Sequence, residues 1–232
     1  MYAEDMFRAA SCTTKMEVFM LLEEEKIRWG MTNIAFGLLM PNGELHMLND
    51  YPSKWQAEYK ENSYINVDPT VKHGLQSVTP IMWSNEQLHT KEVNKFWEHA
   101  REFGLTTGCA QPVWDRQGLF SMLSISRDGL RISESEAIDK LSKLARWAPA
   151  IHAAMTKIIG PQEAPSTIKL TRVEKEVLTL IGTGDTSEKI ADRLKVSART
   201  VNWHIQNVMQ KLNASNRVHA VVKAVQLGLI QL

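Results

Sequence analysis

Several features that would indicate a specialised class of protein are absent from this chain of 232 residues. Its two cysteines, Cys12 and Cys109, are too few for a disulfide framework, and neither lies in a cluster typical of structural zinc, so we expect two reduced, buried thiols. No basic N-terminal segment precedes an apolar run, and the longest apolar stretch, 34–40, is far shorter than the ~20 residues of a membrane span. These absences predict a soluble, cytoplasmic protein with no membrane partner.

Motifs of common enzyme classes are also missing. The sequence contains no P-loop, no G-x-G-x-x-G, no H-E-x-x-H and no G-x-S-x-G, and its seven histidines form no local ligand pair. We therefore predict a protein that is not an enzyme and that needs no metal or cofactor. A catalytic triad that comes together only in the folded chain is the alternative.

Net charge is nearly absent from the chain as a whole, at +1, but the two parts of the chain differ. Residues 168–232 carry ten basic and five acidic side chains, whereas the remainder carries 17 basic and 21 acidic ones. A polar stretch with two prolines separates these parts and is typical of a linker. The predicted organisation is a domain over 1–160, a linker over 161–169 and a domain over 170–232. A net charge of +5 on the second domain suits nucleic acid, although a solvated basic face would have the same composition.

The first domain is predicted to have an α+β fold, an α/β/α sandwich with an antiparallel sheet. Periodicity and turn residues indicate helices over 15–29, 53–62, 85–103 and 131–159 and strands over 33–40, 44–49, 108–114 and 120–127. The last helix has apolar residues at spacings of three or four: Ile138, Leu141, Leu144, Ala145, Ala148 and Ile151. Ala35 and Gly37 share one face of the first strand, and such small residues leave room between the sheet and its helices.

The second domain is predicted to be all-α, with four short helices. Thr171 and Glu174 form a capping box at the first helix, Asp185 or Thr186 caps the second, and Ser197 caps the third. The tight connection over 195–197 is typical of a helix-turn-helix. Val201, Ile205, Val208 and Leu212 form the inward stripe of the third helix, and the fourth helix carries Val218, Val221 or Val222, Val225 and Leu229.

A polar face on the third helix suits the edges of DNA bases, since Asn and Gln can bond adenine and Arg can bond guanine. The candidate DNA-binding residues of this helix are Arg199, Thr200, Asn202, Trp203, Gln206 and Gln210. Candidate phosphate contacts are Thr186, Ser187, Lys189, Lys211, Asn216 and Arg217. A solvated polar helix face is the alternative for each, and Trp203 could instead pack on a neighbouring helix.

Residues 170–232 resemble the LuxR-type helix-turn-helix. The resemblance rests on Leu170-Thr171-x-x-Glu174-Lys175-Glu176-Val177-Leu178, Gly184-x-Thr186-Ser187-x-x-Ile190-Ala191, Thr200-Val201-Asn202-x-His204, Asn207, Lys211-Leu212, Asn216-Arg217 and Leu227-Gly228-Leu229-Ile230. Two positions depart from the family pattern, because Val173 stands where Arg is usual and Trp203 where Phe is usual.

A segment rich in aromatic residues with polar handles, 51–83, would read from composition as ordinary core, with Asp68 capping a helix. The N-terminal part of the chain, over about 20–160, also resembles the autoinducer-binding domain of LuxR-type quorum-sensing receptors. The matching motifs are Tyr51-Pro52-x-x-Trp55-x-x-x-Tyr59, Asp68-Pro69-Thr70-Val71, Pro80-x-x-Trp83, Gly104-Leu105-x-x-Gly108 and Leu123-Ser124-Ile125-Ser126-Arg127.

This second resemblance implies an N-acyl-homoserine lactone as the ligand and gives seven side chains a role. Trp55 would donate to the lactone carbonyl, Asp68 would accept from the amide N–H, and Tyr51 and Ser124 would donate to the acyl carbonyl. Tyr59 and Trp83 would pack against the ligand, and Thr70 would support its polar end.

Together, the resemblances imply a ligand-controlled transcription regulator. A homodimer, formed through the long helix and the last helix, would bind a palindromic operator on double-stranded DNA, with half-sites about 34 Å apart. An activator would also contact RNA polymerase. Two alternatives stay open: a regulator that senses a different small molecule, and one that the lactone releases from DNA.

Overall fold

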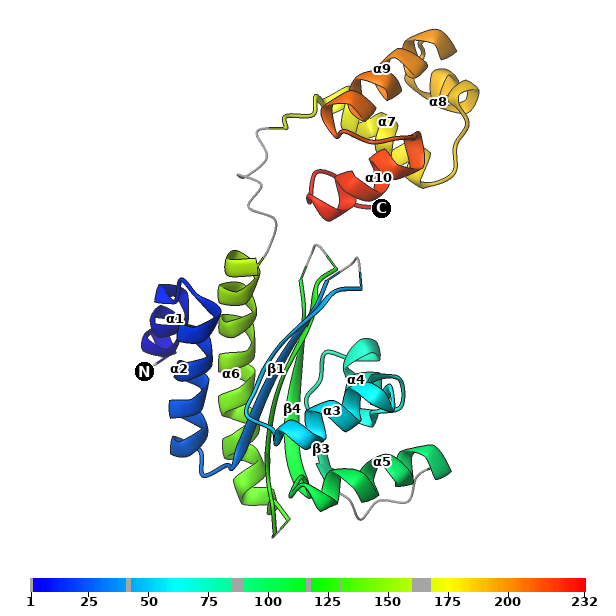
Figure 1. Cartoon of the computed structure of the whole chain (residues 1–232). Helices are drawn as coiled ribbons and strands as arrows, with labels where there is room; N and C mark the ends of the chain where they lie inside the picture. The colour runs from blue at the N-terminus through cyan, green and yellow to red at the C-terminus, as the bar shows by residue number, and fades with distance from the viewer. Residues whose placement is uncertain (1, 41–42, 85–89, 116–117, 130, 160–167) are drawn as a thin grey trace. The chain divides into compact units, whose positions relative to one another are not determined.

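The computed structural model describes residues 2–40, 43–84, 90–115, 118–129, 131–159 and 168–232. These residues form two compact units, a larger N-terminal one and a smaller C-terminal one, and each is described by itself (Figure 1). The predicted linker, 161–169, lies almost entirely outside the described residues, so the exact domain boundaries stay predictions.

The N-terminal unit is built on one antiparallel sheet in the order β2-β1-β5-β4-β3. Its strands are β1 (Asn33–Leu39), β2 (Leu45–Asn49), β3 (Ile81–Ser84), β4 (Thr107–Trp114) and β5 (Phe120–Arg127). In the centre of the sheet Ala35 pairs with Ser124, which in turn pairs with Ala110. Because side chains alternate along a strand, these three small residues share one face of the sheet.

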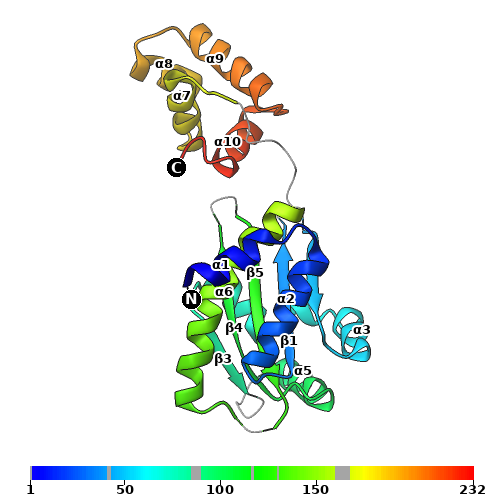
Figure 2. The same ribbon diagram turned by 90° about the vertical axis from the view of Figure 1, so that its left-hand side faces the viewer.

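The opposite face of the sheet carries the main core. Ile34, Phe36 and Leu38 of β1 and Leu123 and Ile125 of β5 are fully buried there. They pack under α1 (Tyr2–Ser11), α2 (Lys15–Arg28) and α6 (Glu134–Ile159), which lie together on that side of the sheet (Figures 1 and 2). Both cysteines are free and buried, as predicted.

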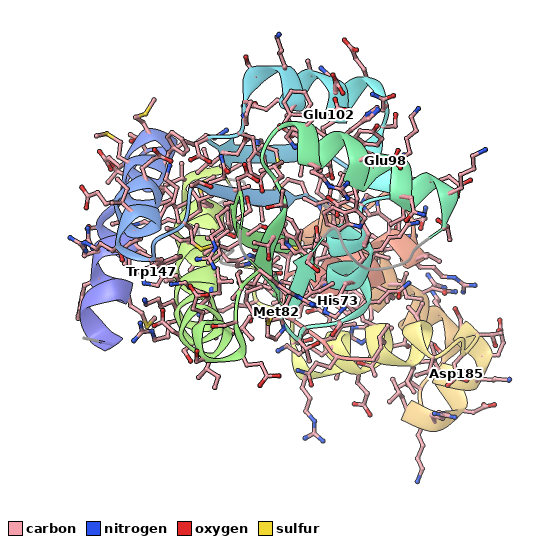
Figure 3. All side chains as sticks on the ribbon, turned by 90° about the horizontal axis from the view of Figure 1, so that it is seen from below. His73, Met82, Glu98, Glu102, Trp147 and Asp185 are labelled. Atoms are coloured by element: carbon pink, nitrogen blue, oxygen red, sulfur yellow. The ribbon has the colours of Figure 1, made fainter. Side chains whose placement is uncertain are left out.

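The face with the small residues is covered by a second helical layer. This layer contains α3 (Ser53–Glu61), the 3-10 turn η1 (Tyr64–Asn66), α4 (Pro69–Gln76) and α5 (Lys91–Glu102). Seen from below, Trp147 of α6 lies on one side of the strands, and Glu98 and Glu102 of α5 lie on the other (Figure 3). The predicted α/β/α sandwich with an antiparallel sheet is confirmed. The sequence analysis did not identify α1, η1, α4 or β3.

The inward stripe of α6 differs in part from the apolar spacing in the sequence. Leu144, Ala148 and Ile151 are buried, but Ile138 is 71% exposed and Ala145 is exposed. Ala137 and Trp147 are among the inward positions of the helix. The helix that this spacing predicted is confirmed over Glu134–Ile159.

The C-terminal unit is all-α, as predicted, with α7 (Arg172–Gly182), α8 (Ser187–Leu194), α9 (Ala198–Lys211) and α10 (Arg217–Gln226). Thr171 and Glu174 form the predicted capping box, and Thr186 and Ser197 cap α8 and α9. The turn between α8 and α9 passes through Lys195, whose left-handed φ of 54° ends α8 abruptly. This geometry makes α8 and α9 the predicted helix-turn-helix.

Apolar packing in this unit differs from the prediction at α10. Val201, Ile205, Val208 and Leu212 are buried as expected. In α10, however, Val218 is 62% exposed and Val222 is 47% exposed, while Ala220, Val221 and Ala224 face the core. The core face of α10 is therefore formed mainly by alanine, and Val218 and Val222 lie outside it.

Candidate functional site

A small cavity of about 50 Å³ lies between the sheet and the layer of α3, α4 and α5. All seven predicted ligand-binding residues line it, from five separate segments of the chain. The lining consists of Tyr51, Trp55, Tyr59, Asp68, Thr70, Trp83, Phe96, Trp97, Ala100, Leu105 and Ser124. The structure thus brings together the residues that the resemblance singled out, together with four from α5 and the loop after it.

Asp68 is the only carboxylate among these lining residues. Its Oδ1 accepts the Thr70 backbone N–H at 2.8 Å and the Thr70 hydroxyl at 2.7 Å, and its Oδ2 accepts the Tyr59 hydroxyl at 2.9 Å. The side chain therefore caps α4, with Pro69 at the first helical position, while it also faces the cavity. Capping a helix and lining a site were alternatives in the sequence, and Asp68 does both.

The environment of Asp68 shifts the titration of the groups around it. Burial raises the pKa of Asp68, and the hydrogen bonds from Thr70 and Tyr59 offset part of that rise. Burial, and then the nearby Asp68 carboxylate, raise the pKa of Tyr59 well above its usual value. The Val71 backbone also hydrogen-bonds this carboxylate, so Asp68 is a buried, ionisable acceptor at the wall of the cavity.

Tyr51 supplies a second polar group to the cavity. Burial raises the pKa of Tyr51 to about 12, and a hydrogen bond with Ser124 opposes part of that rise. The phenol is therefore a neutral donor over the whole physiological range. The residue before Tyr51, Asp50, is anchored by two contacts. Asp50 accepts the Ile34 N–H at 2.8 Å and forms an ion pair with the nearly buried Lys26 of α2.

Aromatic rings form most of the remaining wall. Trp55 stacks on Tyr64, with ring centroids 5.8 Å apart, and Trp83 stacks on Trp97 at 5.1 Å. The Trp83 ring lies directly over Gly108, where a Cβ would come within 2.4 Å of it. The Trp83 Nε1 is buried and has no hydrogen-bond partner, so it can donate to a ligand.

Four lining residues were missed by the sequence analysis: Phe96, Trp97, Ala100 and Leu105. Three of them lie on the buried face of α5: Phe96, Trp97 one position later and Ala100 four positions after Phe96. This apolar face was visible in the sequence, but the pattern fits core packing equally well. Nothing in it indicates that the face closes a cavity.

The predicted DNA face on α9 lies at the surface of the C-terminal unit. Arg199, Asn202, Gln206 and Gln210 are exposed, Thr200 is half-buried, and Trp203 is 60% exposed instead of packing on a neighbouring helix. Ser187 donates to Asn202 Oδ1 at 2.8 Å and so orients that amide. Of the other candidates, Thr186, Lys189 and Arg217 are exposed, and the Asn216 side chain caps α10.

Lys211 has a partner that the sequence analysis did not foresee. Its ammonium lies 2.7 Å from both carboxylate oxygens of Glu174, whose side chain is almost fully buried. Burial alone would raise the pKa of Glu174, but the hydrogen bonds from Lys211 and Thr171 lower it. The lysine therefore secures the start of α7, which competes with its predicted role as a phosphate contact.

Comparison with known proteins places both units in one family. The family description "Autoinducer binding domain" matches residues 14–155, and "Bacterial regulatory proteins, luxR family" matches residues 169–224. The chain belongs to the luxR family. It is 36% identical to the transcriptional activator protein AnoR of Acinetobacter nosocomialis, over 92% of each chain. It is also 31% identical to the quorum-sensing regulator RhlR of Pseudomonas aeruginosa, over 92% of this chain and 89% of RhlR.

Solved structures show the same fold for this luxR-family chain. Escherichia coli SdiA superposes with a TM-score of 0.76 at 23% identity, over 100% of this chain and 98% of SdiA. A second SdiA structure, in complex with octanoyl-rac-glycerol, superposes with a TM-score of 0.73. These structures show the fold. The two family matches and the relatives above identify the chain as a quorum-sensing transcription regulator with an autoinducer-binding domain and a helix-turn-helix.

One group in this luxR-family chain has the residue types of a catalytic triad. Ser121 lies 2.7 Å from His152 Nδ1, and His152 Nε2 lies 3.4 Å from Asp115 Oδ2. Ser121 is fully buried, and none of the three residues lines the cavity. Their contacts join α6 to β5 and to Asp115, the residue that follows β4. Within the described residues no cluster of metal-ligating side chains occurs, and no helix is long and apolar enough to cross a membrane.

Proposed function

We propose that the N-terminal unit binds an N-acyl-homoserine lactone and that this ligand controls binding of the C-terminal unit to DNA. The observation that carries the proposal is the buried Asp68 carboxylate, an acceptor that lines a cavity rimmed by hydrogen-bond donors and aromatic rings. An acyl-homoserine lactone has one amide N–H and two kinds of carbonyl, so its polar groups complement this set. The boundaries we propose are 1–160 for the receptor domain and 170–232 for the DNA-binding domain.

Each lining side chain then has a task. Asp68 accepts the ligand amide N–H, Trp55 donates to the lactone carbonyl, and Tyr51 and Ser124 donate to the acyl carbonyl. Tyr59 and Thr70 hold the Asp68 carboxylate in place, and Trp83 packs against the ring. Pairing every polar group matters because an unpaired buried donor or acceptor costs about 1–3 kcal/mol.

DNA recognition is assigned to the exposed face of α9. A homodimer would place two α9 helices in successive major grooves of a palindromic operator, about 34 Å apart. The exposed Val218 and Val222 of α10 and the long α6 are the surfaces we propose for dimer formation. In the cytoplasm, an activator of this kind would also contact RNA polymerase.

The receptor proposal is tested by calorimetric titration of the full chain with N-octanoyl-homoserine lactone. Asp68→Asn should weaken binding about tenfold to a hundredfold, because it replaces a charge-assisted acceptor worth about 1.5–3 kcal/mol. The matched control is Glu61→Gln, at the exposed end of α3, which should bind as the parent does. Methyl octanoate, whose ester has neither an N–H nor an O–H to donate, should lose little affinity in Asp68→Asn. Equal lactone affinity for the parent and Asp68→Asn would reject the proposed role of Asp68.

A further inference from the structure

A track of small residues leads away from the cavity along the sheet. Ser124, which lines the cavity, pairs with Ala35 of β1. The next residue of β1 on the same face is Gly37, which pairs with Met122 on one side and Met47 of β2 on the other. At about 3.3 Å per residue, Gly37 lies roughly 7 Å beyond Ala35 along the strand. On β1 itself, the surface from Ala35 to Gly37 therefore carries no side chain larger than a methyl group, and Met122 and Met47 flank it.

Met47 fills the space above Gly37. A Cβ built on Gly37 would lie 3.0 Å from the Met47 Sδ and 3.9 Å from its Cε, so the thioether rests on the glycine. Met47 is 47% exposed and belongs to β2, the edge strand. A methionine side chain is unbranched and has three rotatable bonds, so this one can swing toward solvent with little effect on its neighbours.

The same end of the sheet is closed on its β4 side. Gly37, Met122 and Pro112 lie in one row across β1, β5 and β4. On the β4 side of this row, α4 lies with its backbone against the sheet: a Cβ on Gly74 would come within 2.9 Å of the Phe120 ring and 3.3 Å of Pro112. Growth on the β4 side would require movement of a helix, whereas growth over Gly37 requires movement of one side chain.

The size of the cavity makes such growth necessary for an acyl tail. About 50 Å³ is far below the ~300–1,000 Å³ of sites that hold small-molecule ligands. We infer that Met47, resting on Gly37, is the specificity-determining residue for the length of the acyl tail, and that longer tails displace it along the track. This inference rests on the proposed function, because it assumes that an acylated ligand enters with its polar end at Asp68.

The test is a calorimetric series on the full chain with unsubstituted N-acyl-homoserine lactones, with tails from four to twelve carbons. Each additional buried methylene should raise affinity about fourfold until the tail reaches the end of the track. Met47→Ala should move that end toward longer tails by about two carbons, which is about tenfold in affinity for the longest ligands. Gly37→Ala should have the opposite effect, with a loss of about tenfold for long tails and no loss for short ones.

Two further variants separate this role from general destabilisation. The double variant Gly37→Ala/Met47→Ala should recover long-tail binding, because the added methyl then meets no thioether. Met82→Ala is the matched control: Met82 is also a partly exposed strand methionine, but it lies next to Trp83 and so faces the opposite side of the sheet. The affinity of Met82→Ala should depend on tail length as that of the parent does, with the highest affinity at the same number of carbons. Met82 is labelled in Figure 3.

The outcomes are distinguishable. If the parent binds lactones through Asp68 but all variants keep the parent's length profile, the inference about Met47 is wrong and the proposed function stands. If no lactone of any length binds the parent, the proposed function is wrong and the inference falls with it. Loss of binding at every length in Met47→Ala would also contradict the inference, since it would make Met47 a support for the whole cavity.

Discussion

Lys211 offers the sharpest test of how the C-terminal unit is held together. Glu174 is 3% exposed, and the Lys211 ammonium lies 2.7 Å from both of its carboxylate oxygens. Replacement of Lys211 by Met removes this ammonium, so the Thr171 N–H is the remaining donor of the capping box. Loss of one partner of a fully buried ion pair costs about 3–5 kcal/mol. The Lys211 side chain is 38% exposed, so solvent screens the pair, and we expect a loss of about 2 kcal/mol.

Hydrogen exchange on the full chain measures this loss in the relevant segment. A decrease of about 2 kcal/mol corresponds to about thirtyfold faster exchange for the protected amides of α7 and α9. The lowered pKa of Glu174 fixes the pH dependence: its contribution is present above the usual glutamate value and is lost as pH falls through the folded value. The difference between Lys211→Met and the parent should therefore shrink in acid. Glu174→Gln/Lys211→Met should recover most of the loss, because no buried charge is left alone.

Salt dependence of binding to duplex DNA separates this structural role from a phosphate contact. We expect Lys211→Met to keep the slope of log affinity against log salt, when measured where the variant is folded, whereas Arg217→Met should reduce the slope by about 1. Unchanged exchange in Lys211→Met, together with a slope reduced by about 1, would refute the reasoning and return Lys211 to the DNA interface.

Three further predictions concern the N-terminal unit. An ultraviolet pH titration, taken as the difference between the parent and Tyr51→Phe, should give the Tyr51 phenol a pKa of about 12. Because this pKa is raised from 10, the contribution of Tyr51 to stability is lost as pH rises from 10 to 12. A titration midpoint at 10 would contradict the burial of the phenol. Gly108→Ala should lower the free energy of unfolding by about 1–3 kcal/mol and weaken lactone binding, because the added Cβ would lie 2.4 Å from both Trp83 and the Ile125 carbonyl oxygen. An unchanged melting temperature would argue against this packing. Bonds to Arg127, and next the Ser133 backbone N–H, lower the pKa of Glu136 to about 2. An NMR titration should therefore show Glu136 ionised at pH 4, and Arg127→Met should raise the pKa toward the usual glutamate value; an unchanged midpoint would contradict the role of Arg127.

Helix caps and strand alternation predicted most of the architecture, because both are set by residues close together in the sequence. The boundaries of α2, β1, β4 and β5 lie within about one residue of the predicted ones. The segment 69–84 was not assigned, although Asp68-Pro69 is a sound start signal for α4, because β3 has only four residues and shows no clear alternation. Apolar residues also outnumber the places in the core, which explains why Ile138 and Val218 are exposed.

The cavity depended on information that no local pattern contains. Tyr51 and Ser124 are 73 positions apart in the chain and meet only because β1 pairs with both β2 and β5. The family resemblance placed them together, since it carries the tertiary arrangement with it. Where the resemblance gave no role, as for Phe96 and Trp97, the aromatic residues of α5 could equally have been ordinary core.

The central claim is that the Asp68 carboxylate accepts the amide N–H of an acyl-homoserine lactone inside this cavity. The most direct measurement is the proton NMR shift of that amide in ¹⁵N-labelled N-octanoyl-homoserine lactone bound to the full chain. A proton donated to a buried carboxylate should move strongly downfield on binding, and the displacement should be lost in Asp68→Asn while remaining in Glu61→Gln. A bound lactone whose amide proton keeps its position in water, or whose shift is the same in Asp68→Asn, would contradict the account.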